Sequence, residues 1–172
     1  GSENGQHMLE CGACYAPLIL EQGEWYRVFF SMFLHFGAPH LINNILVLFV
    51  LGQRLEPAVG KLKFLLIYIA GGLGGNLISL FWDIHTGDYS VSAGASGAVF
   101  ALMGGMIYVI MRHRGRVADL TIRQMLIMAA FSLYFGFASE GVDNAAHAGG
   151  LVCGFLTAVI VYHPRKIWKI VP

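Results

Sequence analysis

The stretch Ser92-Ala93-Gly94-Ala95-Ser96-Gly97-Ala98-Val99-Phe100-Ala101-Leu102-Met103-Gly104 decides the fold of this chain. It sets Ser96 at the start of an apolar segment that has no charged residue before Arg112. Gly97, Ala101 and Gly104 follow at spacings of four and three, so they share one face of a helix. The pattern predicts a membrane helix that begins with a hydroxyl group. A buried hydroxyl without a partner costs about 1–3 kcal/mol, so we expect Ser96 to have one.

His147 is the partner that the sequence offers. It lies in Asn144-Ala145-Ala146-His147-Ala148-Gly149-Gly150, at the start of the last apolar segment, and ionisable residues in membrane segments are functional candidates. A second face of small residues accompanies it, formed by Ala146, Gly150, Gly154 and Ala158. Two such faces let helix backbones approach closely, which would bring the imidazole within reach of Ser96 as a general base. The alternative is plain helix packing around a hydrogen-bonded serine–histidine pair.

The composition is that of a membrane protein. The 172 residues are 56% apolar and 12% charged, against about 45–50% and about 25% in ordinary soluble domains. The length suits one domain. The net charge of +1 comes without a basic stripe, so we expect no nucleic-acid partner.

Five spanning helices are expected, at about 39–56, 62–82, 96–111, 121–137 and 144–162. The segment from Arg27 to Gly37 is apolar but too short to cross a bilayer, so it predicts a helix lying in the interface beside Trp25 and Tyr26. Residues 1–26 are expected to be a loop. The helix from Ser96 is about 24 Å long against a hydrocarbon core of about 30 Å, which predicts that Ser96 lies below the surface in a polar cavity.

The orientation follows from the basic residues, which gather in the cytoplasmic loops of membrane proteins. Those at one end of the predicted spans are Arg54, Lys61, Lys63, Arg112, Arg114, Arg116, Arg123, Arg165, Lys166 and Lys169. The loops at the opposite end are acidic, and their only basic residue is Arg27. The bias predicts a cytoplasmic C-terminus, with Ser96, His147 and residues 1–26 toward the outer face.

Two further polar residues face the same way at the outer end of the first span. His40 and Asn44 are four residues apart and therefore share a helix face. Together with the Ser96 backbone amide at a helix N-terminus, they could stabilise an oxyanion. Hydrogen-bonded packing between helices is an equally good interpretation from position alone. Asp143 lies four residues before His147, and we expect it to be a solvated loop acid, which leaves a serine–histidine dyad.

The three cysteines suggest no catalytic role. Cys153 lies in an apolar run and is expected to be a small buried hydrophobe. Cys11 and Cys14 form a CxxC pair, for which a disulfide or two ordinary thiols is favoured over a metal site, because two ligands do not hold zinc.

These residues resemble those of the rhomboid family of intramembrane serine proteases, of the bacterial GlpG-like type. Gly94-Ala95-Ser96-Gly97 matches the family's GxSG motif, and Asn144-Ala145-Ala146-His147 with Gly150 and Gly154 is similar to its histidine helix. The remaining matches are His35, His40 and Asn44 in a HxxxxHxxxN pattern, Glu24-Trp25-Tyr26-Arg27, and Gly52, Glu56 and Gly60 in a GxxxExxxG pattern. The resemblance covers about residues 24–162.

The resemblance implies an all-α polytopic membrane protein with a rhomboid-like helical bundle, of which five transmembrane helices are visible and the first of the usual six is absent. It implies Ser96 as nucleophile, His147 as general base, and oxyanion or substrate stabilisation by His40, Asn44 and Gly94. It also implies a lid and gate formed by the loop from Ala138 to Asp143 and the fourth span. Substrates would be single-pass membrane proteins cleaved near the outer face, with no metal or cofactor. The oligomeric state is not predicted.

As a domain plan, we expect one rhomboid protease domain over residues 1–172. It would comprise an outer loop with the interfacial helix (1–37), the five-helix bundle (38–163) and a cytoplasmic tail (164–172), in a bacterial plasma membrane. One alternative is a catalytically silent rhomboid-like binder or chaperone of membrane helices, although such relatives typically lack the serine or the histidine. A small transporter is a second alternative, but it would need polar residues at mid-depth in several helices.

Overall fold

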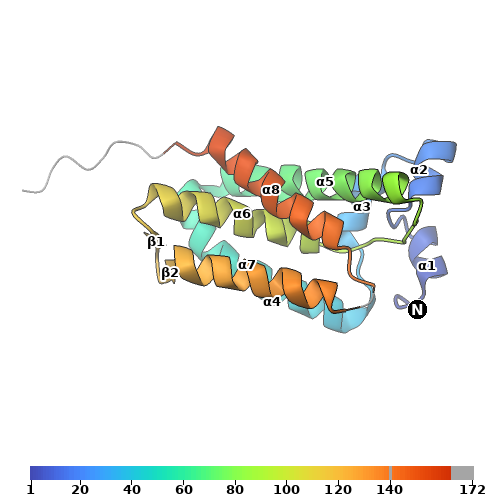
Figure 1. Cartoon of the computed structure of the whole chain (residues 1–172), viewed down its shortest axis with the longest axis horizontal. Helices are drawn as coiled ribbons and strands as arrows, with labels where there is room; N and C mark the ends of the chain where they lie inside the picture. Colours follow the sequence, from blue (N-terminus) through green and yellow to red (C-terminus); the bar gives the residue numbers. More distant parts are fainter. Residues whose placement is uncertain (140, 164–172) are drawn as a thin grey trace, which may run out of the picture.

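The computed structural model describes residues 1–139 and 141–163 and is almost entirely helical. The five expected segments are all present as long helices. They are α4 (Gly37–Val59), α5 (Lys61–Thr86), α6 (Ser96–Arg112), α7 (Ile122–Phe137) and α8 (Asn144–Val161). They run roughly along the long axis of the molecule (Figure 1). The expected tail, with Arg165, Lys166 and Lys169, lies outside the described residues, as does Glu140.

Length and apolar composition set α5 and α8 apart as helices that could each cross a membrane. A third candidate is α4 taken together with the short segment before it, from Arg27 to Phe33, although the two meet at an angle of 89°. The two remaining long helices, α6 and α7, are apolar but shorter, at 17 and 16 residues. Large apolar side chains are exposed on the outside of the bundle, among them Phe49, Phe81 and Phe135, as expected of a surface that meets lipid.

The central element is α6, of which 13 of the 17 residues are buried. Its apolar side chains form the main core with residues from α4, α5, α7 and α8, such as Leu55, Ile67 and Met125, each fully buried. A helix that is apolar on all sides is stable only where neighbours surround it. The segment that begins with Ser96 is therefore the axis around which the bundle packs.

Small residues allow α5, α6 and α8 to touch backbone to backbone. A Cβ atom placed on Gly150 would lie 2.1 Å from the Gly97 carbonyl oxygen, and one on Gly154 would lie 2.0 Å from that of Ala101. In the same way, a Cβ atom on Gly104 would lie 2.0 Å from the Leu151 carbonyl oxygen, and one on Gly71 would lie 2.2 Å from the Ala101 methyl group. Side chains larger than hydrogen cannot occupy these positions without separating the helices. The glycine run from Gly71 to Gly75 thus serves close packing inside an unbroken helix.

The expectation of a structureless loop over residues 1–26 is wrong. The segment contains two short helices, α1 (Gly5–Glu10) and α2 (Ala16–Gln22), which cover one end of the bundle (Figure 1). Helices of six and seven residues have little stability of their own and are too short to show a clear periodic pattern. They are held by packing, since Met8, Ala16 and Ile19 are buried.

Arg27 fastens this N-terminal segment to the bundle. The residue is only 6% exposed, although arginine is usually solvated. Nη1 donates to the carbonyl oxygens of Leu9 at 2.7 Å and Ala13 at 3.0 Å, and Nε donates to the Glu24 carboxylate. A buried cation needs such partners. Arg27 is thus a structural residue.

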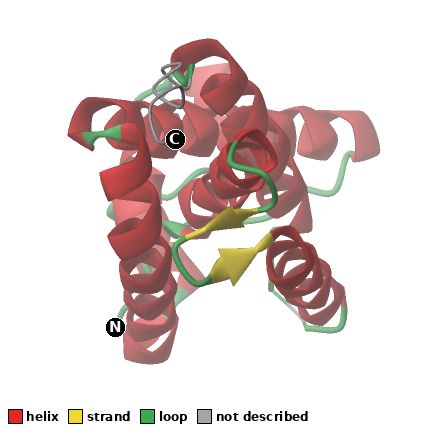
Figure 2. Ribbon diagram, turned by 90° about the vertical axis from the view of Figure 1, so that its left-hand side faces the viewer, coloured by secondary structure: helices red, strands yellow, loops and turns green. Residues whose placement is uncertain are grey.

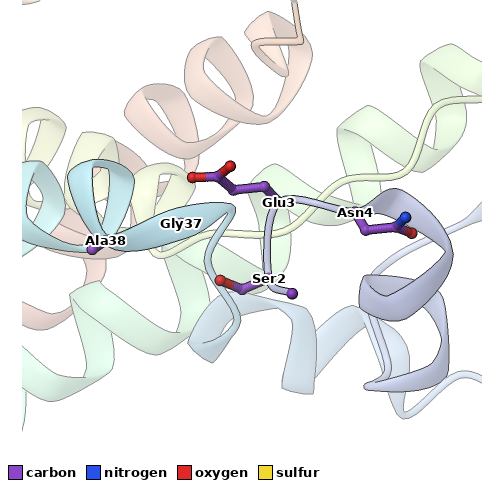
Figure 3. A pocket seen from close by; sticks show the side chains of 6 residues that line it. Ser2, Glu3, Asn4, Gly37 and Ala38 are labelled. Atoms are coloured by element: carbon purple, nitrogen blue, oxygen red, sulfur yellow. The ribbon is translucent and has the colours of Figure 1, made fainter.

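The apolar segment before α4 lies across the end of the bundle. It consists of α3 (Arg27–Phe30) and the 3₁₀-helix η1 (Ser31–Phe33), and it exposes Phe29, Phe30 and Phe33 beside Trp25 and Tyr26. This arrangement fits the expected interfacial helix, because aromatic side chains favour the headgroup region. Gly37 then begins α4 with φ of +79°, and a Cβ there would lie 2.9 Å from Glu3 Oε1. Residues 1–4 border a small hollow at this turn (Figure 3).

The opposite end of the bundle carries a two-stranded antiparallel hairpin between α6 and α7, formed by β1 (Arg116–Val117) and β2 (Leu120–Thr121). Figure 2 shows it in front of the helix ends, and Figure 1 shows it at the end of the bundle opposite α1 and α2. Asp119 lies in the turn of this hairpin, and its carboxylate accepts hydrogen bonds from Arg54 Nε at 2.6 Å and from Arg54 Nη2 at 2.7 Å. The guanidinium group of Arg54 lowers the pKa of Asp119 to about 2.

The three cysteines are free thiols, so Cys11 and Cys14 are not bridged. Cys11 is exposed, whereas Cys14 is buried and its backbone pairs with Ser92. Burial raises the pKa of the Cys14 thiol to about 12. Cys153 is only partly buried, although the sequence predicted a buried residue, and its thiol packs against Gly74.

Candidate functional site

A cavity of about 870 Å³ lies between α4, α6, α7 and α8, at the end of the bundle covered by the N-terminal segment. Ser96, His147, His40, Asn44 and Gly94 all line it. They come from three separate parts of the chain. The residues that the sequence singled out for chemistry therefore share one cavity, whose wall combines polar side chains with a larger apolar part.

Ser96 is the first residue of α6, and the preceding residue leaves the helix end open. The N-cap position is occupied by Ala95, whose side chain cannot accept a hydrogen bond from the first turn. The first amides of an uncapped helix are unpaired donors with a partial positive charge. The backbone N–H of Ser96 is one of them, and it is available beside its own hydroxyl group.

Gly94 allows His40 to approach the turn that carries Ser96. Its φ of +146° is a conformation that side chains rarely adopt. A Cβ at this position would lie 2.8 Å from His40 Cε1, 3.0 Å from His40 Nε2 and 3.6 Å from Ser96 Oγ. The His40 ring and the Ser96 hydroxyl therefore both border the space that a side chain at position 94 would occupy.

Asn44 supports the same wall from the next turn of α4. Its side chain is 4% exposed, and Nδ2 donates to the His40 carbonyl oxygen at 2.9 Å. An amide nitrogen carries two hydrogens, so one remains for a second acceptor.

His147 lies in the first turn of α8 with 8% of its surface exposed. Its ring stacks on Phe100, with the centroids 4.4 Å apart and the planes at 17°. Nδ1 is buried without a hydrogen-bond partner among the described residues. Within residues 1–139 and 141–163 no hydrogen bond joins His147 to Ser96. Contacts of this kind often tighten only when a substrate is bound.

Three separate contacts hold the backbone just before Ser96. Ser92 and Cys14 exchange two backbone hydrogen bonds, at 2.8 and 2.9 Å. The Gly94 N–H donates to the Ser31 carbonyl oxygen at 2.9 Å, and the Ala95 N–H donates to His35 Nε2 at 3.3 Å. The short interfacial segment is therefore part of the scaffold for the nucleophile candidate.

Asn76 anchors this scaffold to α5. It is buried, and Nδ2 donates to the Val28 carbonyl oxygen at 2.8 Å and to Ser31 Oγ at 3.1 Å. The sequence analysis missed this residue. A polar side chain in the middle of the glycine-rich span was the signal that could have found it, because such groups in membrane helices require partners.

The expectation that Asp143 is a solvated loop acid is wrong. Asp143 is half-buried and caps α8, with Oδ1 accepting from the Ala146 N–H at 2.8 Å. Its Oδ2 accepts from Ser79 Oγ and Ser92 Oγ, each at 2.6 Å. These partners lie 64 and 51 residues away in the chain, so no local pattern could reveal them. Among the described residues, neither oxygen of the Asp143 carboxylate forms a hydrogen bond with the His147 ring.

Metal binding finds no support in the part of the chain that the structure describes. No three His, Cys, Asp or Glu side chains there lie close enough together to hold an ion. The site residues predicted from the sequence offer a hydroxyl group, two imidazoles, an amide and a backbone N–H group to this cavity.

Comparison with known proteins places the chain in a family. Residues 22–164 match the model of the Rhomboid domain. The chain is 36% identical to Rhomboid protease GluP of Bacillus subtilis over 165 residues, which is 96% of this chain and 31% of that protein. It is 35% identical to Rhomboid protease AarA of Providencia stuartii over 167 residues, covering 84% of this chain and 59% of that protein. RHOMBOID-like protein 5 of Arabidopsis thaliana is 33% identical over 150 residues, 86% of this chain and 48% of that protein.

The fold is that of an integral membrane protein: a helical bundle with a cavity near one end that is partly lined by polar side chains. The family follows from the comparisons, and the chain belongs to the rhomboid family. The chain spans less than two thirds of the length of the three relatives named here.

Proposed function

We propose that this chain is an intramembrane serine endopeptidase, with residues 1–172 forming one rhomboid protease domain. The observation that carries the proposal is the single cavity lined by Ser96, His147, His40 and Asn44. The relatives named as rhomboid proteases support the same reaction class. No cofactor takes part in the proposed reaction.

In the first step, Ser96 Oγ attacks the carbonyl carbon of the scissile peptide bond while His147 takes the hydroxyl proton. The new C–O bond forms as the carbonyl π electrons move to oxygen, giving a tetrahedral oxyanion. His147 then gives the proton to the leaving amine as the C–N bond breaks. Water next attacks the acyl carbonyl carbon while His147 takes a proton from it, and the C–O bond to Ser96 breaks as His147 returns the proton to Ser96 Oγ. Burial of His147 against Phe100 supports this role, since a neutral imidazole is needed to accept the proton.

The oxyanion would be stabilised by the Ser96 N–H, His40 and Asn44, with Gly94 keeping the turn open. An uncapped helix N-terminus supplies a fixed donor and a partial positive charge at this point. Loss of one such donor typically lowers the rate by about 10²–10³. The close approach of His40 to the Ser96 turn supports its place in this set.

Substrates would be single-pass membrane proteins cleaved near the outer face, with the C-terminus of this chain in the cytoplasm. The bias of basic residues toward the hairpin end supports this orientation. α7 contributes Ser132, Phe135 and Gly136 to the cavity wall, and exposes Phe131 and Phe137 on its outside. A substrate helix in the lipid would therefore reach Ser96 past α7.

Cleavage of a reporter membrane helix in proteoliposomes tests the proposal. The unaltered chain should cleave the reporter. Ser96→Ala and His147→Ala should each lower the cleavage rate by at least about 10³-fold, with an unfolding temperature equal to that of the unaltered chain. Equal cleavage by all three proteins would refute the assignment. Binding of the reporter without cleavage by the unaltered chain would instead favour a silent binder of membrane helices.

A further inference from the structure

Asp143 joins three parts of the chain at one carboxylate. It caps α8 through the Ala146 N–H, and its second oxygen accepts from Ser79 on α5 and from Ser92 just before the Ser96 turn. Hydrogen bonds to a charged acceptor are shorter and about twice as strong as neutral ones, and both serine contacts measure 2.6 Å. Ser79 is 5% exposed, so the junction is fixed to the interior of the bundle.

The position of the His147 ring depends on how the first turn of α8 is held. The His147 N–H donates to the Asp143 carbonyl oxygen at 3.1 Å, which makes Asp143 the start of the turn that carries the ring. The ring itself is oriented by stacking on Phe100, and Nδ1 has no partner among the described residues. With no side-chain hydrogen bond at Nδ1 to orient the imidazole, the placement of the helix end decides where it lies.

The other half of the site depends on Ser92. Its backbone is paired with Cys14, and it lies four residues before Ser96. Its hydroxyl group is the link from this segment to Asp143. One carboxylate therefore sets the distance between the segment that carries the nucleophile candidate and the helix that carries the base candidate.

We propose that Asp143 is a positioning residue for the dyad, acting through Ser79 and Ser92 rather than on the reacting atoms. The inference rests on the proposed function, in which Ser96 and His147 share a proton. Ser92 and Asp143 also line the cavity, but the role assigned to Asp143, Ser79 and Ser92 is to hold the two halves of the site in place.

Asp143→Ser separates positioning from helix capping. Serine is as good an N-cap as aspartate, but its single oxygen cannot cap α8 and also reach Ser79 and Ser92. Ser79→Ala combined with Ser92→Ala breaks the same two contacts from the other side and leaves the cap untouched. We expect each protein to lose about tenfold to hundredfold in kcat with KM within about twofold of the original, since a shift of about 1 Å between reacting groups can cost about 10²-fold.

Combining the changes tests whether they act through one junction. The triple variant Asp143→Ser, Ser79→Ala, Ser92→Ala should be no slower than Asp143→Ser alone, because the contacts are already lost. An unchanged kcat in Asp143→Ser, or in the double serine variant, would overturn the proposal. So would a full multiplication of the losses in the triple variant, or a loss confined to KM.

Amide hydrogen exchange separates failure of this inference from failure of the proposed function. If the unaltered chain neither cleaves the reporter nor reacts with a fluorophosphonate, the proposed function fails, and exchange still tests the junction. We expect the amides of residues 90–95 and of the first turn of α8 to exchange at least about tenfold faster in both variants. Unchanged exchange at these amides would overturn the role of Asp143 whatever the activity.

Discussion

Gly150→Ala tests the contact between α6 and α8 that brings the two halves of the site together. The added Cβ would lie 2.1 Å from the Gly97 carbonyl oxygen, whereas real Cβ atoms essentially never come closer than 3.0 Å to such an atom. The obstacle is backbone, so no side chain can rotate away. The two helices must therefore separate by at least about 0.9 Å at this point, as the difference between these two distances shows.

The separation falls where it affects the dyad most. Gly97 follows Ser96 directly, and Gly150 lies three residues after His147. A misplacement of about 1 Å between reacting groups can lower a rate by about 10²-fold, and overpacking of this kind costs about 1–3 kcal/mol of folding free energy. We expect kcat for reporter cleavage to fall about 100-fold in proteoliposomes, together with a lower unfolding temperature.

Gly52→Ala is the matched control. It adds the same methyl group to a membrane helix, but its nearest neighbour is the Phe64 side chain at 3.6 Å, an ordinary contact. Its kcat and unfolding temperature should stay at the values of the unaltered chain. A Gly150→Ala protein with the activity of Gly52→Ala would show that the close contact does not hold the site, and the reasoning would be wrong.

Three further predictions follow from particular contacts. Gly94→Ala should abolish reporter cleavage, because its Cβ would lie 2.8 Å from the His40 ring at a φ of +146°; cleavage at half the normal rate or more would contradict the proposed geometry. Arg27→Ala should lower the free energy of unfolding by about 1–3 kcal/mol in a thermal or denaturant titration, because two carbonyl oxygens lose their donor. Arg27→Lys should not restore the lost stability, since lysine lacks the planar guanidinium group that reaches several acceptors at once. Arg54 lowers the pKa of Asp119 to about 2, so the contribution of this pair to stability should be full above the ordinary carboxyl pKa of 3.8 and should be lost as the pH falls toward 2. Arg54→Gln should remove this acid dependence of the free energy of unfolding. An unchanged dependence in the variant would refute the pairing.

The bundle was predictable from the sequence because lipid imposes a simple rule on it. A spanning helix must be long and apolar, and close helix contacts require small residues at fixed intervals. Gly150 and Gly154 obey that rule, and the structure has both within van der Waals distance of the α6 backbone. The gathering of His40, Asn44, Ser96 and His147 at one cavity follows from their placement at the same end of their helices.

The supporting contacts were not predictable for a physical reason. Asp143 was expected to be solvated because it sits in an acidic loop, yet its two serine partners come from residues 64 and 51 positions away. The helices α1 and α2 escaped prediction because they are too short to form without tertiary packing. Arg27 was recognised as part of a motif and as an exception to the charge bias, but its carbonyl partners at Leu9 and Ala13 depend on the fold of the N-terminal segment.

The central claim is that the Ser96 hydroxyl reacts because the His147 imidazole can take its proton. Reaction of the detergent-solubilised chain with a fluorophosphonate, followed by peptide mass spectrometry, measures that reactivity directly. The account predicts one adduct, on Ser96, which disappears in His147→Ala and after unfolding. Labelling of Ser96 at the same rate in His147→Ala, or no labelling of the unaltered chain at all, would contradict it.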